Sequence, residues 1–170
     1  MGIAVLICLS LALNLVPVWW GLPTVDDKSW AFDELSPDHL GLDSPGRHRG
    51  RYPPLHYELL RAVYKPFRFL NDRGVLHLSE TVLRGLLQTV GRVLSSLMAT
   101  VTVLLVFLTG RLLMDDPGPL LSSAVVAFSA PFVFFAKTIN LEAPYIFWFA
   151  LALFFYCRIL QSHRPVDYLA

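Results

Sequence analysis

The sequence contains few charged residues, and this scarcity argues against most classes of soluble protein. Of its 170 residues, 16% are charged and 55% are hydrophobic, whereas a soluble domain carries about 25% charged residues. Lysine and arginine together number 14, and aspartate and glutamate 13. No strong positive field therefore indicates a nucleic-acid partner, and the composition predicts a membrane protein.

Cysteines and catalytic motifs are scarce as well. Cys8 and Cys157 both lie in apolar runs, so they provide neither a disulfide framework nor a metal-ligand spacing. The histidines of the polar part match no zinc motif, and the sequence contains no G-x-S-x-G, P-loop or C-x-x-C. These patterns give no support to nucleotide-dependent chemistry.

Long apolar stretches, in contrast, are abundant. A helix that crosses the hydrocarbon layer needs about 20 residues, and four stretches qualify, at about 2–20, 92–113, 118–136 and 144–160. No lysine or arginine precedes the first stretch, which favours a retained anchor over a cleaved signal peptide. We expect an all-α fold of multi-pass transmembrane helices, with residues 1–170 forming the N-terminal part of one membrane domain.

Positive residues near the span ends predict the orientation. Arg111, Arg158 and Arg164 fall on one side and Lys137 on the other, so the arginine side is expected to be cytoplasmic. The polar segment 24–83 is then extracytoplasmic. The expected location is the cell membrane in a bacterium, or the endoplasmic reticulum in a eukaryote.

The polar segment is predicted to contain a surface amphipathic helix over residues 55–70. Its charges recur at helical spacing, and Pro66 is expected to kink or shorten its far end. The charged stripe is either a solvated face or a contact with lipid phosphates. Ser79 is placed to cap a helix that begins at Glu80 and continues into the second span.

Several charged residues near the membrane boundary are open to two interpretations. Asp33 and Glu34 form an acidic pair in an apolar-aromatic setting, either a tunable general base or a solvated turn. Arg92 either contacts a phosphate or anchors its helix at the interface. Lys137 and Glu142 either mark a functional site or pair with each other.

Six motifs follow one another in a characteristic order. They are Asp33-Glu34, Tyr52-Pro53-Pro54-Leu55-His56-Tyr57, Gly91-Arg92-Val93-Leu94-Ser95, Leu108-Thr109-Gly110-Arg111, Asn140-Leu141-Glu142-Ala143-Pro144 and Phe147-Trp148. This order resembles the N-terminal portion of the type C membrane glycosyltransferases. These polyprenyl-phosphate-sugar-dependent enzymes include the protein O-mannosyltransferases and the lipid A aminoarabinose transferases.

The resemblance implies roles for particular residues. Asp33 matches the catalytic base, with Glu34 as its neighbour in the active site, and Arg51, Tyr52 and His56 fall in the substrate-binding region. Glu142 stands where some members use an aspartate to bind a metal. The resemblance thus implies no certain cofactor and leaves a divalent metal ion as the candidate.

The expected reaction moves one sugar from a polyprenyl-phosphate carrier to an extracytoplasmic lipid, glycan or protein acceptor, with inversion at the anomeric carbon. Membrane lipids are further expected partners. Because the family's enzymes are much longer, we expect the chain to be a fragment. The alternative is a non-catalytic membrane subunit or a transporter fragment, in which Asp33 and Glu34 form a solvated turn.

Overall fold

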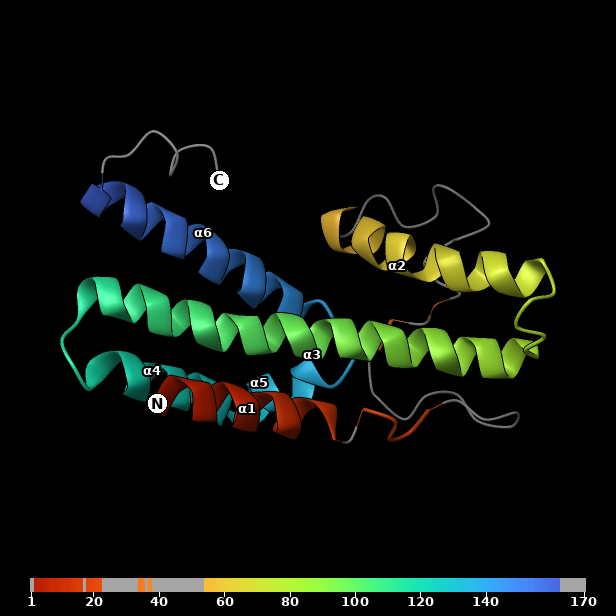
Figure 1. Ribbon diagram of the computed structural model, residues 1–170, viewed down its shortest axis with the longest axis horizontal. Coiled ribbons are helices and arrows are strands. Elements are labelled where there is room, and N and C mark those ends of the chain that lie inside the picture. Colours follow the sequence, from red (N-terminus) through yellow and green to blue (C-terminus); the bar gives the residue numbers. More distant parts are fainter. Residues whose placement is uncertain (1, 17, 23–33, 36, 38–53, 163–170) are drawn as a thin grey trace.

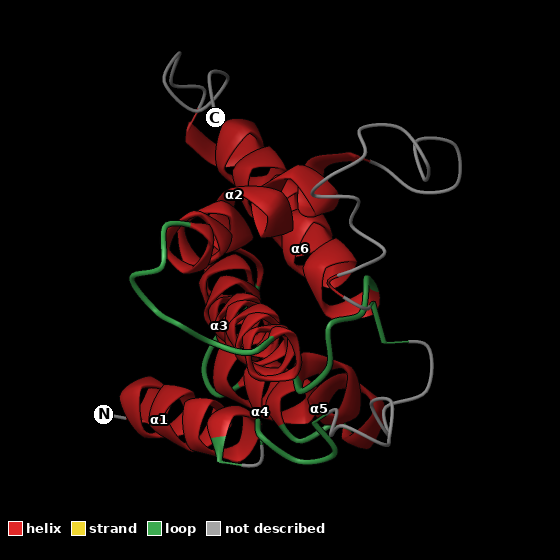
Figure 2. Ribbon diagram, turned by 90° about the vertical axis from the view of Figure 1, so that its right-hand side faces the viewer, coloured by secondary structure: helices red, strands yellow, loops and turns green. Residues whose placement is uncertain are grey.

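The computed structural model describes residues 2–16, 18–22, 34–35, 37 and 54–162. This part of the chain forms six α-helices and contains no strand. They are α1 (Gly2–Leu15), α2 (Pro54–Asp72), α3 (Glu80–Leu113), α4 (Gly118–Ala127), α5 (Ala130–Ala136) and α6 (Glu142–Ser162). The predicted all-α fold is confirmed, as Figure 1 and Figure 2 show.

α3 is the central element, and the other five helices all pack against it. It has 34 residues and is therefore about 51 Å long, whereas a span needs about 20 residues. α3 is therefore about 14 residues longer than one span requires, and we call its N-terminal part, around Leu83 and Leu87, the extension of α3. α2 runs beside this extension, while α1, α4 and α5 lie beside the other half of α3 (Figure 1).

The described helices differ in their ability to cross a membrane. α3 and α6 are each long and apolar enough, and α4 together with α5 makes a third span if the bent pair is counted as one. α4 and α5 meet at an angle of 60°, because Pro131 in the first turn of α5 prevents a helix from continuing through this point. α1 is apolar but has 14 residues and ends at Leu15, before the Trp19-Trp20 pair.

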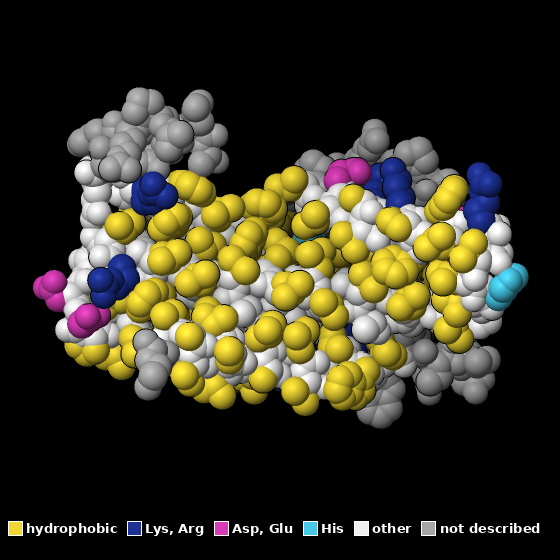
Figure 3. Space-filling model, viewed as in Figure 1, with side chains coloured by type: hydrophobic (Ala, Val, Ile, Leu, Met, Phe, Trp, Pro, Cys, Tyr) yellow, Lys and Arg dark blue, Asp and Glu magenta, His cyan; other side chains and the backbone are white. Residues whose placement is uncertain are grey.

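The surface agrees with a lipid environment. Figure 3 shows hydrophobic side chains over the middle of this face, whereas the charged side chains lie toward its two ends. Exposed apolar side chains occur on every long helix, including Leu97 and Val101 on α3 and Phe149 and Leu153 on α6. Such a large apolar surface is stable where lipid tails cover it.

α2 packs its apolar side against the extension of α3. Leu60 and Tyr64 of α2 form a buried cluster with Leu83 and Leu87 of α3 and with Ile139. The predicted amphipathic helix is therefore present, and α3 covers the side that we expected to rest on lipid. Glu58 and Lys65 remain exposed on the opposite side.

The helix ends of this pair follow from local sequence. Of the two effects expected of Pro66, a kink or a shorter helix, shortening does not occur, because α2 continues to Asp72. Pro66 and Ala62 are exposed, so water can satisfy the Ala62 carbonyl that the proline leaves without a donor. Gly74 then adopts a left-handed conformation, with φ of 67°, which closes the end of α2. Ser79 caps α3 by accepting from the Val82 N–H at 3.5 Å, and this prediction is confirmed.

Candidate functional site

A buried ion pair between Glu34 and Arg92 forms the centre of the candidate site. The Arg92 Nε atom lies 2.7 Å from Glu34 Oε1, and Nη2 lies 2.7 Å from Oε2. The side-chain exposures are 0% for Arg92 and 1% for Glu34. This two-point geometry is the strongest form of an arginine–carboxylate contact.

Further donors and acceptors surround this pair. Gln88 Nε2 donates to Glu34 Oε2 at 2.6 Å, and the Ile139 N–H donates to Oε1 at 2.9 Å. Arg92 Nη1 donates to the carbonyl oxygens of Val18, at 2.9 Å, and Trp20. We call Glu34, Gln88, Arg92 and the backbone of Ile139 the Glu34 hub.

The Glu34 hub joins three distant parts of the chain. It connects the loop after α1, which contains Glu34, to the middle of α3 and to the segment between α5 and α6. The Leu35 N–H, in the same loop as Glu34, also donates to the Ile139 carbonyl at 2.8 Å. Two charges can be buried together only when both are paired and hydrogen-bonded, and both conditions are met here. The hub therefore fixes the position of the polypeptide at Glu34.

This geometry changes the interpretation of two predicted residues. Each carboxylate oxygen of Glu34 accepts two hydrogen bonds, so the side chain is held in one position. Arg92 is buried and paired with Glu34. This contact differs from both interpretations that the sequence suggested, a phosphate contact and anchoring at the interface. Its sequence signal was an arginine against the positive-inside trend, but no local pattern pointed to Glu34 as its partner.

α2 contributes two buried polar side chains on its inner face, His56 one turn before Leu60 and Tyr64 one turn after it. His56 is 1% exposed, and neither ring nitrogen has a hydrogen-bond partner in the structure. Burial lowers the pKa of His56 from 6.5 to about 4, so the ring is neutral at pH 7. A neutral imidazole offers one donor and one acceptor, which suits contact with a hydroxyl group.

Tyr64 is a candidate that the sequence analysis did not single out. Its hydroxyl group is buried without a hydrogen-bond partner. Burial, and to a smaller extent the negative charge of Glu34, raise the pKa of Tyr64. A Cβ atom at Gly91 would overlap this hydroxyl oxygen and would lie 2.8 Å from Ile139 Cδ1. Gly91 therefore leaves the space in which α2 and Ile139 approach α3 beside the hub.

The remaining predicted site residues lie apart from the hub or outside the described part of the chain. Asp33, Arg51 and Tyr52 are outside the described residues. Glu142 is described and lies exposed in the first turn of α6, where a carboxylate favours the positive end of the helix dipole.

The predicted metal ion finds no ligand set among the described residues. They include no group of three His, Cys, Asp or Glu side chains that could hold a metal. Glu142 is exposed and belongs to no such group, so the residues described around it do not fit the metal that the resemblance left open.

Comparison with known proteins identifies one family. Residues 76–170 match the family described as dolichyl-phosphate-mannose-protein mannosyltransferase. The match covers more than half of the chain and includes Gln88, Arg92 and Ile139. No curated protein and no solved structure matches the chain significantly.

Proposed function

The chain belongs to the dolichyl-phosphate-mannose-protein mannosyltransferase family, and from this premise we propose that it carries the catalytic loop of an enzyme that glycosylates hydroxyl groups outside the cytoplasm. Membership indicates a membrane glycosyltransferase, in agreement with the helices that are long and apolar enough to cross a membrane. The proposed donor is a sugar linked to a polyprenyl phosphate, and the proposed acceptor is a hydroxyl group of a lipid, a glycan or a protein.

In the proposed reaction the acceptor oxygen attacks the anomeric carbon of the sugar. Asp33 takes the proton of the acceptor hydroxyl as the new C–O bond forms. The bond between the anomeric carbon and the phosphate oxygen breaks, and the polyprenyl phosphate leaves with the electron pair. Because attack and departure occur on opposite faces, the anomeric carbon inverts. A positioned general base contributes about 10²–10⁴-fold to such a rate.

The Glu34 hub is the observation that supports this proposal. A general base contributes only when its position is fixed relative to the reacting atoms. Glu34 follows Asp33 in the sequence, and its carboxylate is held by Arg92, Gln88 and Ile139 at 2.6–2.9 Å. Burying an ion pair costs free energy that a structural surface turn would not require. We therefore assign Asp33 as the base and Glu34 as a positioning residue.

The other predicted residues receive roles in binding. Arg51 and Tyr52 are proposed to contact the carrier phosphate, and the neutral ring of His56 is proposed to contact a hydroxyl group of the sugar or of the acceptor. Glu142 is proposed as a polar contact at the edge of the site. None of these roles needs a metal ion.

Transfer assays on acidic variants of the full chain test the assignment. Asp33→Asn keeps the size of the side chain but removes its basic oxygen, so turnover should fall by about 10²-fold or more while the donor lipid still binds. Asp27→Asn, in the same loop, is the matched control and should retain activity. Near-normal turnover of Asp33→Asn would overturn the role of Asp33.

Glu34→Gln separates positioning from proton transfer. The amide weakens the bond to Arg92, so both thermal stability and turnover should fall, whereas Asp33→Asn should leave stability unchanged. A loss of turnover in Glu34→Gln with unchanged stability would instead identify Glu34 as the base.

A further inference from the structure

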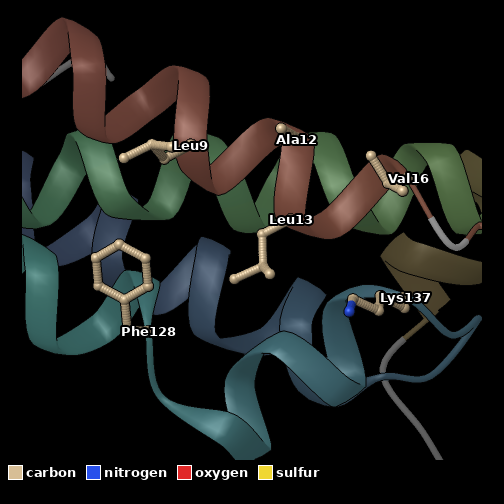
Figure 4. A pocket seen from close by; sticks show the side chains of 6 residues that line it. All are labelled: Leu9, Ala12, Leu13, Val16, Phe128 and Lys137. Atoms are coloured by element: carbon tan, nitrogen blue, oxygen red, sulfur yellow. The ribbon is translucent and has the colours of Figure 1, made fainter.

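A groove is lined in part by Lys137, two residues before Ile139 of the Glu34 hub. The groove between α1 and the bent pair α4–α5, which we call the α1 groove, has a volume of about 450 Å³. Its lining consists of Leu9, Ala12, Leu13, Val16, Phe128 and Lys137. Among these residues Lys137 alone is charged, and Figure 4 shows its ammonium end directed toward the space beside Leu13.

Lys137 lacks the partner that the sequence suggested. It does not pair with Glu142, and no carboxylate among the described residues forms an ion pair with it. Lys137 is partly buried at the boundary of an apolar membrane segment, a position that makes a cation a candidate for function. A ligand that matches it brings a negative charge to the end of the groove.

The walls of the α1 groove are held to a single residue of α3. The Ser96 hydroxyl lies 3.3 Å from the carbonyl oxygen of Asn14 and 3.0 Å from that of Ala136. Asn14 adjoins Leu13 on one wall, and Ala136 adjoins Lys137 on the other. Because Ser96 is completely buried, the spacing of the two walls is built into the fold.

The chemistry of the lining selects the occupant. Four aliphatic side chains and Phe128 favour a hydrocarbon chain, and the ammonium group favours a phosphate at one end. A transmembrane helix of another protein would bury Lys137 without a counter-charge. A lipid that carries a single phosphate satisfies both parts of the groove.

The position of Lys137 connects this lipid to the proposed reaction. Lys137 precedes by two residues Ile139, whose N–H binds Glu34 and whose carbonyl accepts from Leu35. Two residues span at most about 7 Å, so a phosphate at Lys137 would lie next to the loop that carries the base. We propose that the α1 groove binds the part of the isoprenoid chain nearest the phosphate of the polyprenyl-phosphate carrier, with Lys137 as one contact of that phosphate. This assignment rests on the proposed function.

Binding of undecaprenyl phosphate to the full chain in phosphatidylcholine nanodiscs tests the proposal without turnover. Lys137→Gln removes the charge, and Leu13→Trp fills the groove, so each should raise Kd by about tenfold. The matched controls are Lys65→Gln on exposed α2 and Leu153→Trp on α6. Leu13 and Leu153 have similar exposures, 38% and 40%, and the controls should leave Kd unchanged.

Photo-crosslinking tests the proposal on the wild-type chain and therefore does not depend on how the variants fold. A benzophenone-labelled polyprenyl phosphate bound to the wild-type chain should label residues of α1 and the region of Phe128. Unchanged Kd in both groove variants, or labelling confined to α6, would overturn the proposal. Equal competition by phosphatidylglycerol would also overturn it, because the groove would then be a site for bulk anionic lipid.

The two proposals fail in different ways. If the enzyme transfers sugar and Lys137→Gln leaves the KM for the donor unchanged, the groove assignment is wrong and the proposed function stands. If the groove variants lose carrier binding but Asp33→Asn transfers sugar normally, the groove assignment stands and the proposed base is wrong.

Discussion

Arg92 binds both carboxylate oxygens of Glu34 at 2.7 Å, and neither side chain is accessible to solvent. The two residues are 58 positions apart, and their contact ties the loop after α1 to the middle of α3. A surface ion pair would contribute little to stability. In a buried pair, loss of either side chain leaves the other charge without its counter-charge and lowers the stability of the fold.

Removal of Arg92 should therefore be strongly destabilising. Arg92→Met leaves the Glu34 carboxylate buried without its counter-charge, which costs about 3–5 kcal/mol. The double variant with Glu34→Gln should recover part of this loss, and a double-mutant cycle of unfolding in nanodiscs measures the coupling. Arg111→Met is the control, because its ion pair with Asp116 is exposed and should contribute less than about 1 kcal/mol. Equal effects of the two single variants would contradict the role of the hub.

A methyl group at Gly91 should displace α2. In Gly91→Ala the new Cβ atom would overlap the Tyr64 hydroxyl oxygen and would lie 2.8 Å from Ile139 Cδ1, so thermal stability should fall. Tyr64→Phe removes the closer of these atoms and should restore part of the loss. Thermal unfolding of the two single variants and the double variant measures this.

Gly85→Ala is the matched control for this prediction. Apart from the neighbouring backbone of α3 itself, no heavy atom lies within 4 Å of the Cβ position at Gly85, and alanine favours a helix over glycine by about 1 kcal/mol. This variant should be as stable as the wild type or more stable. A similar loss in both alanine variants would show that close packing at Gly91 is not the cause.

Because burial lowers the pKa of His56, the stability of the fold should depend on pH. Its pKa falls from 6.5 in the unfolded chain to about 4 in the folded chain, so between these values the unfolded chain binds more protons. The contribution of the neutral ring is complete above about pH 6.5 and is lost as the pH falls toward 4. Between pH 7 and pH 5 the free energy of unfolding should decrease by roughly 2 kcal/mol.

Variants at two histidines separate this effect from general acid sensitivity. His56→Phe should weaken the pH dependence of thermal unfolding between pH 7 and pH 5. His77→Asn changes an exposed histidine with φ of 49°, a conformation that asparagine tolerates, and should keep the wild-type dependence. An unchanged dependence in His56→Phe would exclude His56 as the source.

The orientation in the membrane is tested by cysteine labelling. In a background with Cys8→Ala and Cys157→Ala, Lys65→Cys on α2 and Asp115→Cys between α3 and α4 both place a thiol on an exposed position. The arginine distribution predicts that an impermeant thiol reagent reaches Lys65→Cys from outside the cytoplasm and Asp115→Cys from the cytoplasm. Labelling from the same side would contradict the orientation.

Local features of the fold were predictable from the sequence. Ser79 precedes Glu80 in a typical capping arrangement, and the charges of α2 recur at helical spacing, so both elements were identified. Pro131 carried a signal for the break between α4 and α5, but the apolar composition around it favoured one continuous span.

The partners of buried polar residues were not predictable in the same way. An arginine such as Arg92 can pair with any carboxylate that the fold brings near, and sequence spacing contains no information on a contact across 58 positions. Tyr64 looked like one aromatic residue of an apolar face, because its burial beside Gly91 and near Glu34 depends on the packing of α2 against α3. The resemblance to a known family therefore indicated the chemistry of the site. The contacts that hold Glu34 and Arg92 in place became visible only in the three-dimensional structure.

The long-range contacts of Glu34 also impose an order on biosynthesis. Ile139, which donates to Glu34, is 105 positions later in the sequence, so at about 5–20 residues per second the ribosome adds it roughly 5–20 s after Glu34. Arg92, the counter-charge, follows Glu34 by 58 positions, so the ion pair can form before Ile139 has been made. The hydrogen bond from the Ile139 N–H can form only when the segment between α5 and α6 has been made. The loop after α1 therefore gains its complete set of contacts late in the synthesis of the chain.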